Sequence, residues 1–263
     1  MIKQNLHCHT TFDDGANTPE EMVQAALKYG LTSLGITLHA PIEGEFWTPP
    51  KYNEPAFIEE MHRLRDKYKG TIDIYCGLEY DLYGPRYFEP YEYIVASGHV
   101  IDGLYVDNTL ERHHQLREHC GGELGNIERY FSNVAAIADI PEADIVGHFD
   151  LLTKYNEMEN LYDINARAYK DAAYAAMEKL VKADKIFEMN TGAISRGYRK
   201  TPYMGADMLK QLKALGGKLT IQSDGHFSDA VACAFDLCED IAKSCGFDEI
   251  WYFDGEKFYP EKF

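Results

Sequence analysis

The chain has 263 residues, of which 45% are hydrophobic and 26% are charged, proportions typical of a globular protein that can bury a core of its own. Its 43 Asp and Glu residues outnumber its 26 Lys and Arg residues, which gives a formal net charge of −17 at pH 7. Because nucleic acids and anionic membrane surfaces repel a protein of this charge, we predict neither as a partner.

The start of the chain and its cysteines bear on localisation. No basic segment followed by an apolar run opens the sequence, and no uninterrupted apolar stretch reaches the roughly 18 residues that a membrane-spanning helix needs. The six cysteines are scattered, without a C-x-x-C pair. In a chain of this length that pattern favours free thiols over a disulfide framework, so we predict a cytoplasmic protein.

Strand and helix patterns alternate along the chain. Short runs of apolar and β-branched residues predict strands at 3–8, 33–38, 72–77, 93–98, 144–149, 185–190 and 218–223, with a last one near 248–253. Amphipathic runs predict helices at about 18–30, 55–68, 126–139, 163–183, 205–215 and 229–245. Residues 103–125 are polar, and we interpret them as an irregular insertion over one face of the fold.

This alternation predicts an α/β fold. Because no linker, low-complexity run or repeat interrupts the chain, we expect residues 1–263 to form a single domain. Seven strand–helix units in one domain predict parallel strands with helical crossovers, closed or nearly closed as a barrel. An open, doubly wound sheet is the alternative.

Side chains that can carry chemistry gather where the predicted strands end. The residues at or just beyond these ends are His7, His9, His39, Glu79, His99, His148, Asp224 and His226. In a barrel of parallel strands these positions meet at the C-terminal face, where active sites of this architecture lie. Because imidazole and carboxylate groups together suit zinc, iron or manganese, we predict a metal cluster at that face.

Other polar residues are weaker candidates for the same site. Asp13 and Asp14 follow the first strand, and we favour Asp14 as a ligand, with a plain Asp-Gly turn as the alternative. The histidines outside the strand ends are His62, His113, His114 and His119. We expect His62 to be solvated on a charged helix, and we interpret the other three as part of a solvated or lid segment rather than of a second metal site.

Motifs spread over nearly the whole chain resemble the PHP (polymerase and histidinol phosphatase) family, and most of all its histidinol-phosphatase branch. The segments that carry the resemblance are HCHT at 7–10, FDDG at 12–15, ITLHAP at 36–41, GLEYD at 77–81, YIVASGHVIDG at 93–103, IVGHFDLLTKY at 145–155, FEMNTGAISR at 187–196 and IQSDGH at 221–226. They occur in the order that the family shows. Two positions depart from its pattern: Leu38 stands where relatives usually carry an acidic residue, and Asp13 replaces a commoner serine.

The resemblance implies a distorted (β/α)₇ barrel that holds two or three divalent ions of zinc, iron or manganese. The ligand sets that it implies are His7, His9, Glu79 and Asp224 for one ion, Glu79, His99 and His148 for a second, and Asp14, His39 and His226 for a third. It also implies that Lys154 and Arg196 bind the phosphate of a substrate. Glu79 and Asp224 are then the candidates for a catalytic role.

The activity that the resemblance implies is hydrolysis of a phosphate monoester, above all of L-histidinol phosphate to L-histidinol and phosphate in histidine biosynthesis. One alternative is another phosphoesterase of the same family that acts on nucleotides or other small phosphate esters. The other is a non-catalytic binding domain that keeps its metals for structure alone.

Overall fold

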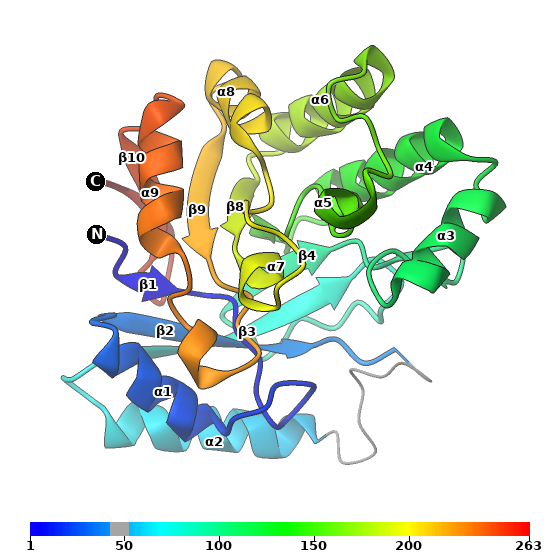
Figure 1. Ribbon diagram of the computed structural model, residues 1–263. Helices are drawn as coiled ribbons and strands as arrows, with labels where there is room; N and C mark the ends of the chain where they lie inside the picture. Colours follow the sequence, from blue (N-terminus) through cyan, green and yellow to red (C-terminus); the bar gives the residue numbers. More distant parts are fainter. Residues whose placement is uncertain (43–52) are drawn as a thin grey trace.

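A sheet of seven parallel strands forms the centre of the protein in a computed structural model that describes residues 1–42 and 53–263 (Figure 1). Its strands, in spatial order, are β1 (Gln4–Asn5), β2 (Ser33–His39), β3 (Asp73–Asp81), β4 (Tyr93–Ser97), β7 (Ile145–Val146), β8 (Ile186–Asn190) and β9 (Lys218–Gln222). Every neighbouring pair is parallel. Each of the seven strands overlaps a predicted one, although β1 and β7 are only 2 residues long.

The first and last strands meet, so that the sheet closes almost completely. A parallel bridge joins Cys8 to Gly225, and the His9 backbone N–H donates to the Gly225 carbonyl at 2.9 Å. Asn5 completes this seam, because its side chain donates to Ser223 Oγ at 2.8 Å and accepts from the Ser223 backbone N–H at 3.1 Å. The result is a distorted seven-stranded barrel, which confirms the predicted barrel over the doubly wound alternative.

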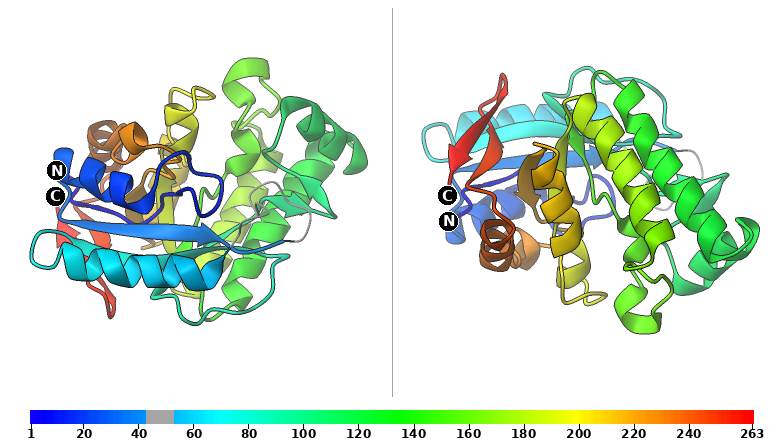
Figure 2. Two further views of the ribbon diagram at one scale, coloured as in Figure 1. Left: turned by 90° about the horizontal axis from the view of Figure 1, so that it is seen from below. Right: turned by 90° about the horizontal axis from the view of Figure 1, so that it is seen from above.

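Helices cover the outside of the barrel (Figure 2). The crossover helices are α1 (Pro19–Lys28), α2 (Glu54–Lys67), α4 (Glu123–Ala135), α6 (Arg167–Lys182) and α8 (Ala206–Ala214). The helix α9 (Phe235–Ser244) follows the last barrel strand, and each of the six helices overlaps a predicted one. Shorter helical turns are η1 (Ala136–Asp139), η2 (Leu151–Thr153), α5 (Asn156–Glu159), α7 (Gly192–Ser195) and η3 (Ser228–Ala230). A capping box starts α1: Thr18 Oγ1 accepts from the Glu21 N–H, and the Glu21 carboxylate accepts from the Thr18 N–H. Among the described residues no helix combines the length and the apolar character needed to cross a membrane.

The stretch 103–125 is regular, so its interpretation as an irregular insertion is wrong. It contains β6 (Leu104–Tyr105), which forms a hairpin with β5 (Val100–Ile101), and the helix α3 (Leu110–His119). The side chain of Thr109 caps α3. Only His113 and Leu116 of this helix are buried, so the apolar stripe on which a periodicity search depends is missing from it.

The last predicted strand, β10 (Glu249–Phe253), lies outside the barrel sheet. It pairs antiparallel with β11 (Phe258–Lys262), which the sequence patterns do not predict. Gln4 holds this hairpin to the barrel, because its side chain donates to the Phe253 carbonyl and accepts from the Phe253 N–H, each at 2.8 Å. The two ends of the chain therefore lie side by side (Figures 1 and 2).

Tyr93 fills the middle of the barrel. Its side chain is buried, and its hydroxyl donates to the Leu6 carbonyl at 2.6 Å. Gly35 of β2 and Gly77 of β3 make room for the ring, because a β-carbon at either position would lie 2.2 Å from an atom of Tyr93. Phe253 packs against the same ring at a centroid distance of 5.6 Å. Since the interior is packed, a pocket can form only at an end of the strands.

Candidate metal centre

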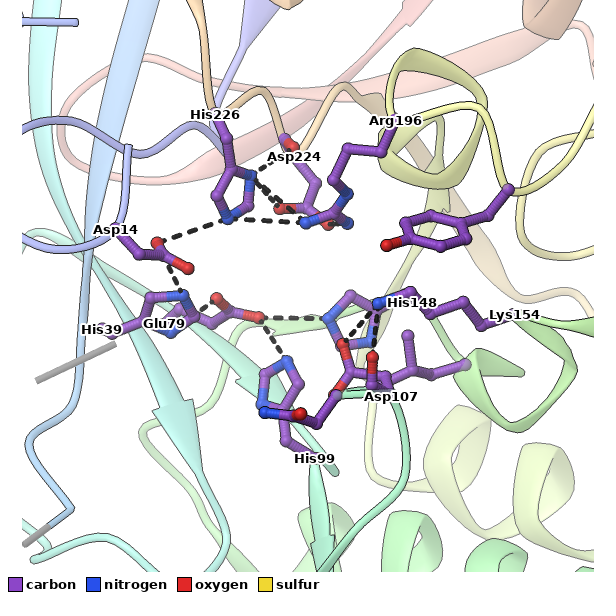
Figure 3. Close-up of a pocket in the computed structure, with 13 residues that line it drawn as sticks. Asp14, His39, Glu79, His99, Asp107, His148, Lys154, Arg196, Asp224 and His226 are labelled. Carbon is purple, nitrogen blue, oxygen red and sulfur yellow. Dashed lines mark hydrogen bonds and ion pairs between the residues drawn. The ribbon is translucent and has the colours of Figure 1, made fainter. Parts of the chain in front are cut away.

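The nine side chains predicted as metal ligands converge at the carboxyl ends of the barrel strands. Figure 3 shows those that line the pocket. They are His7 and His9 after β1, Asp14 in the loop before α1, His39 at the end of β2, Glu79 in β3, His99 after β4, His148 after β7, and Asp224 and His226 after β9. Seven of the nine line a pocket of about 230 Å³. The other two, His7 and His9, are completely buried and contact the carboxylate of Glu79.

Glu79 lies at the centre of this cluster. Its carboxylate faces the rings of His7, His9, His39, His99 and His148. The Oε2 atom is 3.1 Å from His39 Nδ1, and it is 3.2 and 3.3 Å from the Nε2 atoms of His9 and His7. The Oε1 atom is 3.1 Å from His148 Nε2 and 3.4 Å from His99 Nε2. Each oxygen thus faces a different set of rings.

Buried carboxylates behind the cluster hold its imidazoles in place. Glu188 in β8 accepts from His7 Nδ1 at 2.6 Å and from the His148 backbone N–H at 2.8 Å. Asp81 in β3 lies 3.3 Å from His99 Nδ1 and accepts from the His99 backbone N–H at 2.9 Å. With Nδ1 engaged in this way, His7 and His99 present Nε2 toward Glu79.

Asp13 also holds imidazoles of the cluster in place, and in this it differs from its neighbour Asp14. The Asp13 carboxylate lies 2.8 Å from His9 Nδ1 and accepts from the His39 backbone N–H at 3.1 Å. Asp14 instead lines the pocket, where Oδ1 is 3.3 Å from His226 Nε2 and 3.5 Å from His39 Nε2. The geometry therefore supports Asp14 as the candidate ligand, whereas Asp13 holds His9 and His39 in place.

Asp81 and Glu188 are absent from the sequence-predicted site, although the sequence carries a signal for each. Asp81 follows Glu79 by two positions, so both side chains point to the same side of β3. Glu188 is the one acid in the strand segment IFEMN. We call Asp13, Asp81 and Glu188 the supporting carboxylates from here on.

The candidate ligand atoms fall into three groups, within each of which they lie no more than 4.8 Å apart. The groups are His7, His9 and Asp224, then Glu79, His99 and His148, and finally His9, Asp14, His39 and His226. These groups share most members with the three sets that the family resemblance implies, but Glu79 is missing from the first and His9 is added to the third. The Oε2 atom of Glu79 also borders the first group, through its contacts with His7 and His9.

Three buried atoms of these groups test whether the site fits metal ions. Within the described part of the chain, His7 Nε2, His9 Nε2 and Asp14 Oδ1 have no hydrogen-bond partner. Leaving a buried polar atom unpaired is costly, and a divalent cation would engage these lone pairs. Imidazole nitrogens combined with carboxylate oxygens are also the donors that first-row divalent metals prefer. The residues therefore fit divalent metal ions.

The imidazoles of the cluster differ in proton affinity. Burial alone favours the neutral ring of His9, but Asp13 and Glu79 outweigh it and raise the pKa of His9 to about 10. The ring of His39 stacks on that of His9 at a centroid distance of 4.2 Å. Burial and the positive charge on His9 lower the pKa of His39 to about 4. A proton is therefore held on one ring of the stacked pair and excluded from the other.

The carboxylates of the cluster are ionised. The pKa values of Asp14, Glu79 and Asp224 all lie well below their usual range. Burial opposes the ionisation of each group, but neighbouring imidazoles and, at Asp224, the Arg196 guanidinium outweigh it. The cluster thus offers anionic oxygens to a cation.

The two side chains predicted to bind phosphate reach the same pocket. Arg196 follows α7, and its Nη2 donates to Asp224 Oδ2 at 2.9 Å. Lys154 follows η2, and its Nζ donates to the Asp107 carbonyl and lies 3.3 Å from Asp107 Oδ2. Each cation therefore lies at the edge of the metal groups with a carboxylate beside it (Figure 3).

Four residues that the sequence patterns do not single out also line the pocket. They are Asp107, Asn108, Leu151 and Tyr198. The first two lie between β6 and α3, so the stretch 103–125 does border the site. A polar residue in a polar segment gives no sign of whether it faces the site or the solvent, so no sequence signal marks this pair.

His113 is buried, which contradicts the expectation of a solvated side chain. It is 0% exposed, with Nδ1 2.6 Å from the Val106 carbonyl and Nε2 2.7 Å from the Tyr162 hydroxyl. It therefore fastens α3 to the loop that leads into the pocket. The side chains of His62, His114 and His119 are exposed, as expected.

Fold and site together define a class: a distorted (β/α)₇ barrel with a divalent-metal site of imidazoles and carboxylates at the carboxyl ends of its strands. The chain belongs to the PHP domain family, whose model matches residues 5–192.

Known relatives extend this similarity over the full length. A histidinol-phosphatase of Lactococcus lactis subsp. lactis (strain IL1403) is 25% identical over 275 aligned positions, which cover 100% of this chain and 98% of the relative. The histidinol-phosphatase of Bacillus subtilis (strain 168) is also 25% identical, over 90% of this chain and 98% of the relative. The crystal structure of histidinol phosphate phosphatase from Lactococcus lactis, complexed with zinc, L-histidinol and phosphate, has a TM-score of 0.79 at 21% identity and covers 98% of each chain. That structural likeness demonstrates the shared fold.

Proposed function

We propose that this chain is a metal-dependent phosphatase that hydrolyses L-histidinol phosphate to L-histidinol and phosphate. The observation that carries the proposal is the composition of one pocket, in which the metal groups around Glu79 adjoin the cations Arg196 and Lys154. That combination suits a phosphate dianion. The choice of substrate is supported by the relatives named histidinol-phosphatase, which match the chain along nearly its whole length.

In this proposal the residues of the three groups would hold two or three divalent ions of zinc, iron or manganese. Such ions supply Lewis-acid chemistry, which neutralises charge on a phosphoryl group and acidifies water. Arg196 and Lys154 donate hydrogen bonds to phosphoryl oxygens. Asp224, which is buried and ionised beside Arg196, accepts a hydrogen bond from the attacking water and orients it.

The opening above the metal groups favours a catalytic site over a purely structural one. Structural metal sites are closed, whereas catalytic sites keep a position open for substrate. Here Glu79, His99, His148 and Asp224 face a pocket of about 230 Å³ that also contains Arg196. A binding domain that keeps metals for structure alone has no use for this space.

The test is phosphate release from L-histidinol phosphate, a nucleoside monophosphate and a sugar phosphate, before chelation, after it, and after return of zinc, manganese or iron. We expect the fastest turnover on L-histidinol phosphate, loss on chelation and recovery with metal. Unchanged turnover by fully metal-free protein would contradict the metal dependence. If the metal-restored enzyme prefers a nucleotide, the proposed substrate is wrong, but the proposed phosphatase activity is retained.

A further inference from the structure

Asp107 differs from the other acidic residues of the pocket. Asp14, Glu79 and Asp224 each belong to a metal group, whereas Asp107 belongs to none of the three. It lies instead beside Lys154, in the stretch between β6 and α3 (Figure 3). The role of this carboxylate is therefore separate from metal binding.

Main-chain contacts on both sides hold Asp107 in place. The Val106 N–H donates to the His99 carbonyl at 2.8 Å, and the Val106 carbonyl lies 2.6 Å from His113 Nδ1. The Asp107 carbonyl accepts from the Tyr155 hydroxyl at 3.0 Å. A group held in this way loses little freedom when it binds a ligand.

The Asp107 carboxylate is charged and keeps capacity for another partner. Burial opposes its ionisation, but Lys154 and His99 outweigh burial and lower its pKa. Its Oδ2 lies 3.3 Å from Lys154 Nζ, beyond the roughly 2.7–2.9 Å of a strong charge-assisted hydrogen bond. Among the described residues no side chain or backbone N–H donates to Oδ1, and the side chain is 15% exposed.

The surroundings of Asp107 indicate what it could bind. A phosphoryl group is drawn to the metal groups, Arg196 and Lys154, so the alcohol part of an ester is left beside the remaining wall of the pocket. Among the described residues, that wall includes Asp107, Asn108, Leu151 and Tyr198. An anionic carboxylate and an aromatic ring both attract a positive charge, and the carboxylate repels a second phosphate or carboxylate.

We propose that Asp107 selects the substrate by binding a positively charged amino group on the alcohol part of the ester. This inference rests on the proposed phosphatase function and adds to it a residue that determines substrate specificity. The preferred esters are phosphate monoesters of amino alcohols, and the disfavoured ones are nucleotides and sugar phosphates.

The rival explanation is that Asp107 serves only to hold Lys154. Lys154 would contact the phosphate, which every ester has, so loss of Asp107 would then slow all esters by the same factor. Two esters that differ only in the amino group separate the two explanations, because only an amino-binding residue changes their ratio.

The experiment compares L-histidinol phosphate with its des-amino analogue, imidazolylpropyl phosphate, on metal-loaded protein. We expect the wild-type chain to prefer the amino ester in kcat/KM by about 10- to 100-fold, the effect of a hydrogen bond to a charged group. Asp107→Asn is expected to reduce this preference to below about threefold, and Asp107→Glu, which keeps the charge, to retain part of it. Asp102→Asn, in the β5–β6 hairpin that precedes Asp107 and outside the pocket, is the control and should keep the full preference.

Metal content and circular dichroism, measured on each variant, establish that only the side chain has changed. Equal losses on both esters, with the preference intact, would assign Asp107 to holding Lys154 and overturn the inference. A wild-type enzyme that hydrolyses both esters equally well would also overturn it and leave the phosphatase function standing. If loaded wild-type protein hydrolyses neither ester, the proposed function fails and the inference fails with it.

Discussion

The supporting carboxylates decide which ring nitrogen each deep imidazole presents to the pocket. Glu188 takes Nδ1 of His7 and also the backbone N–H of His148, so one carboxylate ties the ends of two strands together. Asp13 does the same for His9 and His39. The ligand atoms are therefore oriented by the chain itself before any metal arrives.

Glu188→Gln tests this orientation. Glutamine keeps the size of the side chain but removes the negative charge that holds His7, so we expect the affinity for zinc to fall by about 10- to 100-fold. Competition with a chromogenic chelator measures the change. Glu178→Gln is the matched control, because Glu178 is an exposed residue of α6 paired with Lys182, and its loss should leave the affinity unchanged. An unaltered affinity in Glu188→Gln would contradict the role of Glu188.

Proton release on metal binding follows from the raised pKa values. His9 has a pKa of about 10, and His99 has one of about 9, because Glu79 and the supporting carboxylate beside it outweigh burial. Both rings are protonated at pH 7.5 in the metal-free protein, and a metal ion must displace those protons. We expect the release to diminish as the pH rises through 9 and 10. Calorimetry in buffers of different ionisation enthalpy measures it, and a binding heat independent of the buffer would contradict the prediction.

At this scale the sequence predicts which side chains come together better than it predicts their orientation. His39, His99 and His148 follow predicted strands, and the barrel brings strand ends together whatever the loops do. The choice between Asp13 and Asp14 depends on the turn after β1, which no periodicity describes. The place of Asp107 in the pocket cannot be predicted from the sequence for a similar reason. Its backbone is positioned by contacts of its neighbour Val106 with residues elsewhere in the chain.

Among the elements, β2 and β3 show how the interior limits the choice of residue. Both strands are longer than the others in the sheet, and both carry a glycine that faces the Tyr93 ring. Their apolar runs make them easy to predict. The helix α3 is hard to predict because only His113 and Leu116 are buried, so it lacks an apolar stripe. β7 is shorter than its apolar run because only Ile145 and Val146 pair with the neighbouring strands.

Gly77→Ala tests the packing of these strands. The new β-carbon would lie 2.2 Å from a ring atom of buried Tyr93, so we expect the free energy of unfolding to fall by about 1–3 kcal/mol. Urea denaturation measures the change. Gly205→Ala is the control, because no atom lies within 4 Å of a β-carbon there and φ is −65°. Wild-type stability in Gly77→Ala would mean that Tyr93 moves aside without cost.

At the scale of the whole molecule, the net charge differs in sign from the cationic groups that the pocket gathers. The chain carries a net charge of −17, but its pocket gathers imidazoles, Arg196 and Lys154 around the groups that fit metal ions. The barrel itself is predictable, since seven strand–helix alternations leave few other arrangements. The hydrogen bonds of Asn5 that close the seam cannot be predicted in this way, because they join residues more than 200 positions apart.

Metal removal should lower the thermal stability of the whole chain. A ligand that binds only the folded state at 100 times its Kd adds about 2.7 kcal/mol, which corresponds to roughly 5–10 °C in Tm for a chain of this length. We expect chelation to lower Tm by this amount and zinc to restore it, as measured by calorimetry. His9→Asn removes a ligand shared by two groups and should respond much less to zinc. Identical Tm values with and without metal would refute this linkage.

The group of His7, His9 and Asp224 spans the seam between β1 and β9. More than 200 residues separate the two histidines from Asp224, so the group depends on long-range contacts, and loop closure delays such contacts in folding. A growing or partly folded chain has the histidines of β1 long before β9 brings Asp224 to them. The candidate group is therefore complete only when β9 has met β1, which is the step that closes the barrel.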